Sequence, residues 1–284
     1  MTRIGVVGGG VIGASVAHAL AEAGCEPTVV DVDDAAVEAA RGRIRDHVRA
    51  TRVLIRNGPQ EPTARTLERV ALTTDLGRLG DVPFVIENVT EDWELKAALY
   101  RELDGVLDAD CVLATNTSAI PISRLAALVR RPERVVGIHF MNPVAKIRLV
   151  EVVRGHETSE ATLARAFELL TAMGKEWVVV NDGAGFVTNR VLMLAINEAV
   201  AAVQDGVAEP AAVDRLFEGC LGHRLGPLHT ADLIGLDTVL RTLDVLQEHF
   251  RDGRFEAAPL LRETVAAGRL GRKTGRGFFD YGGG

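Results

Sequence analysis

Two ionisable residues interrupt apolar runs of the sequence. His139 ends the run 135–139, and Glu151 lies inside the run 149–153. Burying a carboxylate is costly unless it has a partner, and two strands this close in the chain are expected to pair antiparallel. Such pairing would place Glu151 near His139, the arrangement of a general base whose ring is held by an acid. Taken alone, His139 is better explained as a satisfied core histidine.

A glycine-rich motif follows the first apolar run. Gly8, Gly10 and Gly13 have the spacing G-x-G-x-x-G at the start of a helical pattern, with Val11 and Ile12 between the last two glycines. The first glycine permits a tight turn, the second admits a pyrophosphate to the backbone, and the third lets the helix pack on the strand. The helix N-terminus then offers N–H groups to phosphate. The alternative interpretation is a plain glycine-rich turn.

An acidic residue supports dinucleotide binding. Asp31 ends the second apolar run, eighteen residues after Gly13, where the 2′-hydroxyl of a ribose needs an acceptor. Its carboxylate would repel a 2′-phosphate, and the neighbouring Val32 offers no compensating cation. The sequence therefore predicts NAD as the cofactor in preference to NADP.

The elements that must position these residues alternate along the chain. Short β-branched runs alternate with longer helical patterns, which is typical of βαβ units and a mainly parallel sheet. We therefore predict an α/β, Rossmann-like fold whose ligands lie beyond the carboxyl ends of the strands. The expected strands are 4–7, 28–32, 84–87, 112–115, 135–139, 147–153 and 177–180, and the expected helices are 11–23, 35–55, 91–103, 122–128 and 160–173.

A second domain is expected after the sheet. The segment 181–185, Asn-Asp-Gly-Ala-Gly, punctuates the chain, and no convincing strand follows it. Residues 186–204 are apolar nearly all round, which favours a long helix buried in a helical domain or a subunit interface. We expect an NAD-binding domain over 1–182 and an all-helical substrate domain over 183–284, with the substrate in the cleft between them.

Composition argues against several classes of protein. The 284 residues are 47% hydrophobic and 25% charged, which is typical of a globular protein. The net charge of −7 gives no bulk attraction to nucleic acid or to an anionic membrane surface. No segment has the about 20 uninterrupted apolar residues of a membrane span. The spacing of the three cysteines and seven histidines indicates no metal site, and we expect free thiols in the cytoplasm.

Further motifs follow in order along nearly the whole chain. They are Asn116-Thr117-Ser118, His139-Phe140-Met141-Asn142-Pro143, Leu149-Val150-Glu151-Val152, Gly185-Phe186-Val187-Thr188-Asn189-Arg190, Gly226-Pro227, Gly235-Leu236-Asp237 and Gly271-Arg272-Lys273-Thr274-Gly275-Arg276-Gly277-Phe278. Together they resemble the 3-hydroxyacyl-CoA dehydrogenase family, which includes bacterial 3-hydroxybutyryl-CoA dehydrogenases. This ordered series is far more specific than the glycine motif alone.

The resemblance implies a mechanism. His139 would remove the proton of a 3-hydroxyl while hydride passes from C3 to the nicotinamide. Glu151 would accept the other ring N–H and stabilise the imidazolium. Ser118 and Asn189 match family positions that hydrogen-bond the substrate oxygen, whereas the structural alternative for Ser118 is to cap the helix after Pro121.

The resemblance also implies cofactor contacts and an assembly. The family has cofactor contacts at the positions of Glu91, Lys96, Asn142 and Lys273. The alternatives are a solvated helix face for Glu91 and Lys96 and a basic cluster near the end of the chain for Lys273. The family's members dimerise through the helical domain, so a homodimer is expected.

The chain departs from the family pattern where relatives contact CoA. By counting from Asp31, the two contact positions fall on His47 and Leu54, and neither keeps the family's chemistry. Arg49, Arg52 and Arg56 lie nearby and could substitute, since a shift of one residue along a helix rotates its face by about 100°.

Three more departures affect the expected substrate pocket: Asn88 follows Glu87 in place of alanine, Lys146 replaces a valine, and Arg224 replaces a proline. Polar neighbours favour a hydroxylated acyl group or an anionic carrier over a hydrocarbon tail. The sequence therefore favours a substrate on an acyl carrier protein, as in the glyceryl-carrier-protein dehydrogenases that supply polyketide synthases. An ordinary 3-hydroxybutyryl-CoA dehydrogenase is the alternative, and a non-catalytic, crystallin-like protein is the third interpretation.

Overall fold

In the computed structural model, the chain divides into two compact units, Met1–Gly183 and Ala184–Gly284. The structure describes residues 2–54 and 63–282, with the backbone alone at 52–54 and at 63. Arg56 therefore lies outside the described residues. The boundary expected after residue 182 falls one residue before the observed one.

The first unit is built on an eight-stranded sheet with the order β3-β2-β1-β4-β5-β6-β7-β8. Neighbouring strands are parallel except β6 and β7, which are antiparallel as expected. The prediction of a Rossmann-like, mainly parallel sheet is therefore confirmed. The strands are β1 Arg3–Val7, β2 Glu26–Val30, β3 Ala71–Thr73, β4 Phe84–Glu87, β5 Val112–Thr115, β6 Val135–His139, β7 Leu149–Arg154 and β8 Glu176–Asn181.

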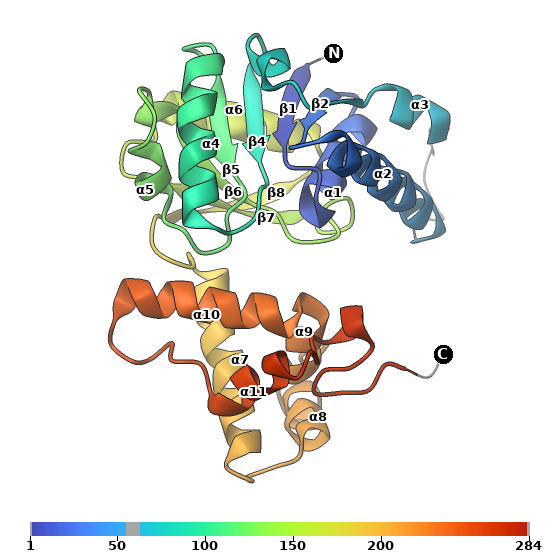
Figure 1. Ribbon diagram of the computed structural model, residues 1–284, viewed down its shortest axis with the longest axis vertical. Coiled ribbons are helices and arrows are strands. Elements are labelled where there is room, and N and C mark those ends of the chain that lie inside the picture. The colour runs from blue at the N-terminus through green and yellow to red at the C-terminus, as the bar shows by residue number, and fades with distance from the viewer. Residues whose placement is uncertain (1, 55–62, 283–284) are drawn as a thin grey trace. The chain divides into compact units, whose positions relative to one another are not determined.

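Helices cover both faces of this sheet. Figure 1 shows α4 and α5 on one face and α6 on the other. Side-chain caps help to set where two of them begin, because Asp92 accepts a hydrogen bond from the Leu95 N–H and Ser159 accepts one from the Thr162 N–H. The helices of this unit are α1 Val11–Glu22, α2 Asp34–Leu54, α3 Thr63–Glu68, α4 Trp93–Val106, α5 Ile122–Ala126 and α6 Glu160–Ala172, with 3-10 turns at Leu76–Leu79 and Pro132–Arg134. The sequence patterns do not predict α3 or β3, which are only six and three residues long.

The period of two along the strands places His139 and Glu151 on the face of the sheet opposite the core that includes α1 and α6. Alternate strand residues such as Val136, Ile138, Val150 and Val152 are buried in one core with α1, α2 and α6. Because successive strand side chains point to opposite faces, His139 and Glu151 point to the other face. The register pairs His139 directly with Glu151, and residues opposite each other in an antiparallel pair share a face.

The second unit is helical, as predicted. Its core packs apolar residues from all of its helices, including Ile196, Leu228, Leu243 and Leu261. The helices are α7 Thr188–Gln204, α8 Pro210–Leu221, α9 Pro227–Ile234, α10 Leu236–Phe250 and α11 Pro259–Ala266, followed by a 3-10 turn at Arg272–Thr274.

The long helix of this unit is not fully buried within the helical domain, and its alternative place in a subunit interface stays a prediction. α7 begins at Thr188 and is not buried all round: Met193 and Ile196 are buried, whereas Val187 just before it and Val191 are more than half exposed. The sequence does not reveal this asymmetry, because a valine or leucine is apolar whether its face of the helix is buried or exposed. Among the described residues, no helix combines the length and the hydropathy needed to cross a membrane.

Candidate active site

The site is built around a contact between His139 and Glu151. His139 Nδ1 lies 3.0 Å from Glu151 Oε2, and the two side chains are only 5% and 6% exposed. An ionised carboxylate can only accept, so Nδ1 carries the hydrogen and the neutral ring keeps its lone pair on Nε2. The geometry therefore leaves Nε2 as the ring nitrogen that can take a proton.

Glu91 holds the loop that carries Ser118. Its Oε1 accepts hydrogen bonds from Thr117 Oγ1 at 2.5 Å, from the Ser118 N–H at 3.1 Å and from the Ala119 N–H at 2.8 Å. The alternative of a solvated helix face is therefore wrong for Glu91, whose side chain is 19% exposed. Its contact with the cofactor stays a prediction.

The alternative role of Ser118 as a helix cap is also wrong. The first N–H groups of α5, at Ile122 and Ser123, donate to the carboxylate of Asp182 at 2.8 and 2.7 Å. Asp182 thus takes the capping position that the sequence offered to Ser118. The function of Ser118 in binding the substrate oxygen stays a prediction.

Lys96 is buried and paired with a carboxylate that the sequence did not single out. Its Nζ lies 2.6 Å from Glu87 Oε1 and 3.9 Å from Glu91 Oε2, and its side chain is fully buried. Thr115 Oγ1 donates to the other oxygen of Glu87 at 2.9 Å. A solvated helix face is thus wrong for Lys96 as well, and its cofactor contact stays a prediction.

The same physical signal that pointed to Glu151 also applies to Glu87. Glu87 ends the apolar strand β4 and is fully buried, so its charge needs a partner. Lys96 supplies that partner. The burial of Tyr100 and the neighbouring charge of Glu87 raise the pKa of the Tyr100 phenol well above its ordinary value.

The glycine turn after β1 has little room for side chains. Gly8 has φ +87°, and a Cβ on Gly13 would lie 1.8 Å from the carbonyl oxygen of Gly8. A Cβ on Gly9, which the motif leaves unspecified, would lie 2.4 Å from Cβ of Ala40. Only Gly10 faces open space. The open space at Gly10 thus leaves an approach to the start of α1, where a pyrophosphate would bind.

Asp31 lies beside this turn. Its Oδ2 accepts from the Gly9 N–H at 2.7 Å and its Oδ1 accepts from the Val32 N–H at 2.8 Å. Gly8, Asp31 and Val32 line a cavity of about 540 Å³ with residues that follow β3 and β4 and residues of α4. The turn, the carboxylate and the cavity fit the phosphates and ribose of a dinucleotide.

Four other predicted cofactor residues have different surroundings. Val11 is exposed and Ile12 half-buried at the start of α1, and Asn142 is exposed after β6, where the Asn142–Pro143 peptide is cis. In the second unit, Lys273 Nζ contacts Asp237 Oδ1 at 2.5 Å and Oδ2 at 2.7 Å. Burial alone would raise the pKa of the Asp237 carboxyl. The hydrogen bond and the charge of Lys273 outweigh burial, so the pKa lies below its ordinary value.

Asn189 also belongs to the second unit. It is the second residue of α7 and is half-buried. Its hydrogen bond to the substrate oxygen stays a prediction, as do the cofactor contacts of Asn142 and Lys273.

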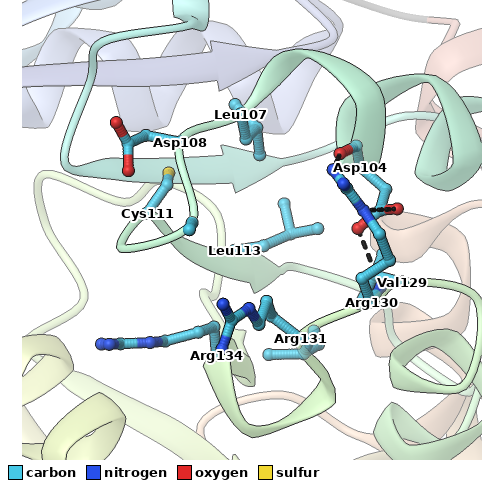
Figure 2. Close-up of a pocket in the computed structure, with 11 residues that line it drawn as sticks. Asp104, Leu107, Asp108, Cys111, Leu113, Val129, Arg130, Arg131 and Arg134 are labelled. Atoms are coloured by element: carbon cyan, nitrogen blue, oxygen red, sulfur yellow. Dashed lines mark hydrogen bonds and ion pairs between the residues drawn. The ribbon is translucent and has the colours of Figure 1, made fainter.

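A second cavity lies at the opposite end of the strands from His139. Figure 2 shows this cavity of about 360 Å³, lined at the amino ends of β5 and β6 by Cys111 and three arginines. Each arginine has an acidic neighbour: Arg130 contacts Asp104, Arg134 contacts Asp110, and Arg131 contacts Glu133. Burial raises the pKa of Cys111 to about 12, so this thiol is not a nucleophile at neutral pH. In parts of the chain that the structure describes, no cluster of three or more His, Cys, Asp or Glu side chains could hold a metal.

Comparison with known proteins identifies both units. The family model for the 3-hydroxyacyl-CoA dehydrogenase NAD binding domain matches residues 3–183, and the model for the C-terminal domain matches residues 185–281. A probable 3-hydroxybutyryl-CoA dehydrogenase of Bacillus subtilis is 40% identical over 98% of this chain and 97% of its own.

Solved structures give the same result. FadB2 of Mycobacterium tuberculosis is 41% identical, with a TM-score of 0.94 over 99% of each chain. The (S)-3-hydroxybutyryl-CoA dehydrogenase PaaH1 of Ralstonia eutropha is 37% identical, with a TM-score of 0.90 over all of both chains.

The fold and the site together define an NAD-dependent oxidoreductase that acts on a CH–OH group. The predicted cofactor, NAD, is thereby confirmed. More narrowly, the chain belongs to the 3-hydroxyacyl-CoA dehydrogenase family.

Proposed function

We propose that this protein oxidises the 3-hydroxyl of an acyl thioester to a 3-oxo group, with His139 as the general base. The observation that carries the proposal is the 3.0 Å contact between His139 Nδ1 and Glu151 Oε2 at the carboxyl end of β6. It supports a ring that turns Nδ1 to the acid, so that Nε2 is the nitrogen that would accept the hydroxyl proton.

Each of the predicted catalytic residues then has its own function. Bound NAD supplies the acceptor for the hydride that leaves C3. His139 takes the hydroxyl proton, and Glu151 stabilises the positive charge that develops on the ring. Ser118 and Asn189 donate hydrogen bonds to the substrate oxygen and so orient it. Glu91 keeps the Ser118 loop in place through its backbone contacts.

The cofactor residues divide between the two ends of the dinucleotide. Gly8, Gly10 and Gly13 with the start of α1 would hold the pyrophosphate, and Asp31 would accept from the ribose. Asn142 lies in the loop that follows β6, the strand that carries His139, so its position favours a contact at the nicotinamide end. Lys96 would act through Glu91, since its own ammonium group is buried against Glu87.

For the carrier of the acyl group we propose coenzyme A. The names of relatives that are 36–41% identical over 98% of this chain are those of 3-hydroxybutyryl-CoA dehydrogenases. Arg45 and Arg49 are among the exposed arginines of α2 and offer cations for nucleotide phosphates. Lys146 and Arg224 are both exposed as well.

A carrier protein is the second candidate, favoured by the surroundings of His47. The His47 ring stacks on His18 with their centroids 6.4 Å apart. Burial, with His18 next in importance, lowers the pKa of His47. A neutral, half-buried ring at this position gives a CoA nucleotide no cationic contact. An acyl group on phosphopantetheine without a nucleotide would not need one.

One assay tests the function and separates the carriers. Formation of NADH is followed by absorbance with (S)-3-hydroxybutyryl-CoA and with 3-hydroxybutyryl and glyceryl groups on a holo acyl carrier protein. We expect turnover of the CoA thioester, and a preference for either carrier-bound substrate would select the second candidate. If no hydroxyacyl thioester yields NADH, the proposed function is wrong and a non-catalytic protein becomes the better explanation.

A further inference from the structure

The strand that carries His139 is attached to β5 by a side chain. The parallel pairing of β5 with β6 ends at Thr115 and Gly137, two residues before His139. Beyond that point, the Phe140 N–H donates to Asn116 Oδ1 at 2.8 Å. Asn116 thus continues the attachment of β6 to β5 past His139, on the strand edge opposite β7.

Asn88, the residue after β4, fixes the orientation of Asn116. Asn116 Nδ2 donates to Asn88 Oδ1 at 3.0 Å, and Asn88 Nδ2 donates to the Ile86 carbonyl at 3.0 Å. A terminal amide has two orientations related by a flip. These two contacts select the orientation that presents Asn116 Oδ1 to the Phe140 N–H.

Asn88 also lies against the dinucleotide turn. Its N–H donates to the Val7 carbonyl at 2.7 Å, at the end of β1. A Cβ on Gly13 would lie 3.3 Å from Cβ of Asn88, and a Cβ on Gly8 would lie 3.1 Å from the Asn88 carbonyl. One half-buried residue therefore contacts both the turn that would hold NAD and the amide that holds the backbone after His139.

We infer that Asn88 is a positioning residue for the dehydrogenase reaction. Through Asn116 it holds the backbone after His139 in register with the cofactor turn, so that the imidazole meets the hydroxyl at the right distance from the nicotinamide. This inference rests on the proposed function. Misplacing a general base affects the chemical step directly, because proton transfer needs hydrogen-bonding distance.

The test measures the rate of hydride transfer in a single turnover, by stopped-flow absorbance of NADH. Asn88→Ala removes the acceptor for Asn116, and we expect the rate to fall about 5- to 10-fold, the worth of about one net hydrogen bond. KM for NAD is expected to stay within about twofold of that of the native protein, since no binding group is lost.

A second variant keeps the acceptor. Asn88→Asp retains an oxygen for Asn116 Nδ2, so hydride transfer is expected to stay within about threefold of the native rate. The new negative charge beside the turn should instead raise KM for NAD, because it repels the pyrophosphate. A fall in rate equal to that of Asn88→Ala would contradict the inference.

Asn197 offers a matched control for a purely structural effect. Its side-chain amide makes two hydrogen bonds, as that of Asn88 does: Nδ2 donates to the Glu256 carbonyl at 2.8 Å, and Oδ1 accepts from the Ala258 N–H at 2.9 Å. Asn197→Ala should lower the melting temperature without slowing hydride transfer. If it slows hydride transfer as much as Asn88→Ala does, lost stability explains both results and the inference is wrong.

A double-mutant cycle tests the route through Asn116. If Asn88 acts only through Asn116, replacing both residues with alanine should slow hydride transfer no more than Asn116→Ala alone does. If the two losses in rate add, Asn88 does not act through Asn116. If the native protein and Asn88→Ala transfer hydride at the same rate, the inference is wrong but the proposed function is unaffected. A native protein without activity would refute both.

Discussion

The chemistry of a single histidine in this protein depends on one neighbouring acid. His139 and Glu151 are both almost fully buried and 3.0 Å apart. In such a place an imidazolium is far less stable without a counter-charge. In the proposed mechanism Glu151 therefore has two functions: it would select the tautomer of the His139 ring, and it would stabilise the cation that forms during the reaction.

Substitutions of these two residues should differ in severity. His139→Gln removes the base, and we expect kcat to fall by about 10²–10⁴-fold. Glu151→Gln leaves the base but removes its counter-charge, and we expect a smaller fall, of about 10²-fold. Steady-state NADH formation measures both effects, with circular dichroism to show that each variant is folded. Near-native turnover by His139→Gln would exclude it as the base.

At the scale of an element, the turn between β1 and α1 is defined by the space around its glycines. Gly13 must be close to the Gly8 carbonyl for α1 to start where it does, because a Cβ there would overlap that oxygen. Gly10 meets nothing within 4 Å. The motif therefore contains one glycine that the fold needs for packing, Gly13, and one, Gly10, that the fold does not need and that we expect to admit the ligand.

This difference predicts distinct effects of two alanine substitutions. Gly13→Ala should lower the free energy of unfolding by about 2–4 kcal/mol, because backbone must shift to admit the methyl group. Gly10→Ala should change stability by less than about 1 kcal/mol but weaken NAD binding, since the methyl group occupies the approach to the backbone. Urea unfolding and titration with NAD measure the two quantities. Equal losses of stability would contradict this division.

At the scale of the whole molecule, the helical unit exposes apolar side chains beyond those its own core uses. Leu216 and Leu221 of α8 are 58% and 63% exposed, and Leu225 follows them at 44%. Exposed apolar groups that gather on one element are typical of a protein interface. This observation supports the expected homodimer, and α8 is the element we expect to contribute to it.

Light scattering with size-exclusion chromatography tests that expectation. The native protein should have twice the 30.4 kDa mass of the chain. Leu216→Glu combined with Leu221→Glu should shift it towards the monomer at micromolar concentration, because two charges would be buried at the interface. A native protein that elutes with the mass of one chain would show that the exposed leucines serve another purpose.

Local patterns in the sequence were enough to predict the sheet apart from β3, the helical second unit and the His139–Glu151 pair. Short β-branched, apolar runs predict strands, and the short connection after His139 predicts an antiparallel return. These features depend on residues close together in the chain. The glycine spacing and Asp31 predicted the cofactor for the same reason, since one βαβ segment contains them all.

Only the tertiary structure decided the roles of polar residues on separate elements. On a helical pattern Lys96 and Glu91 are consistent with a solvated face, yet Lys96 is buried against Glu87 and Glu91 binds the Ser118 loop. Likewise, nothing local in the sequence connects Asn88 to Asn116, because their contact joins the ends of two strands 28 residues apart. Hydrogen bonds between distant residues depend on how strands and helices pack, and no periodicity within one segment contains that information.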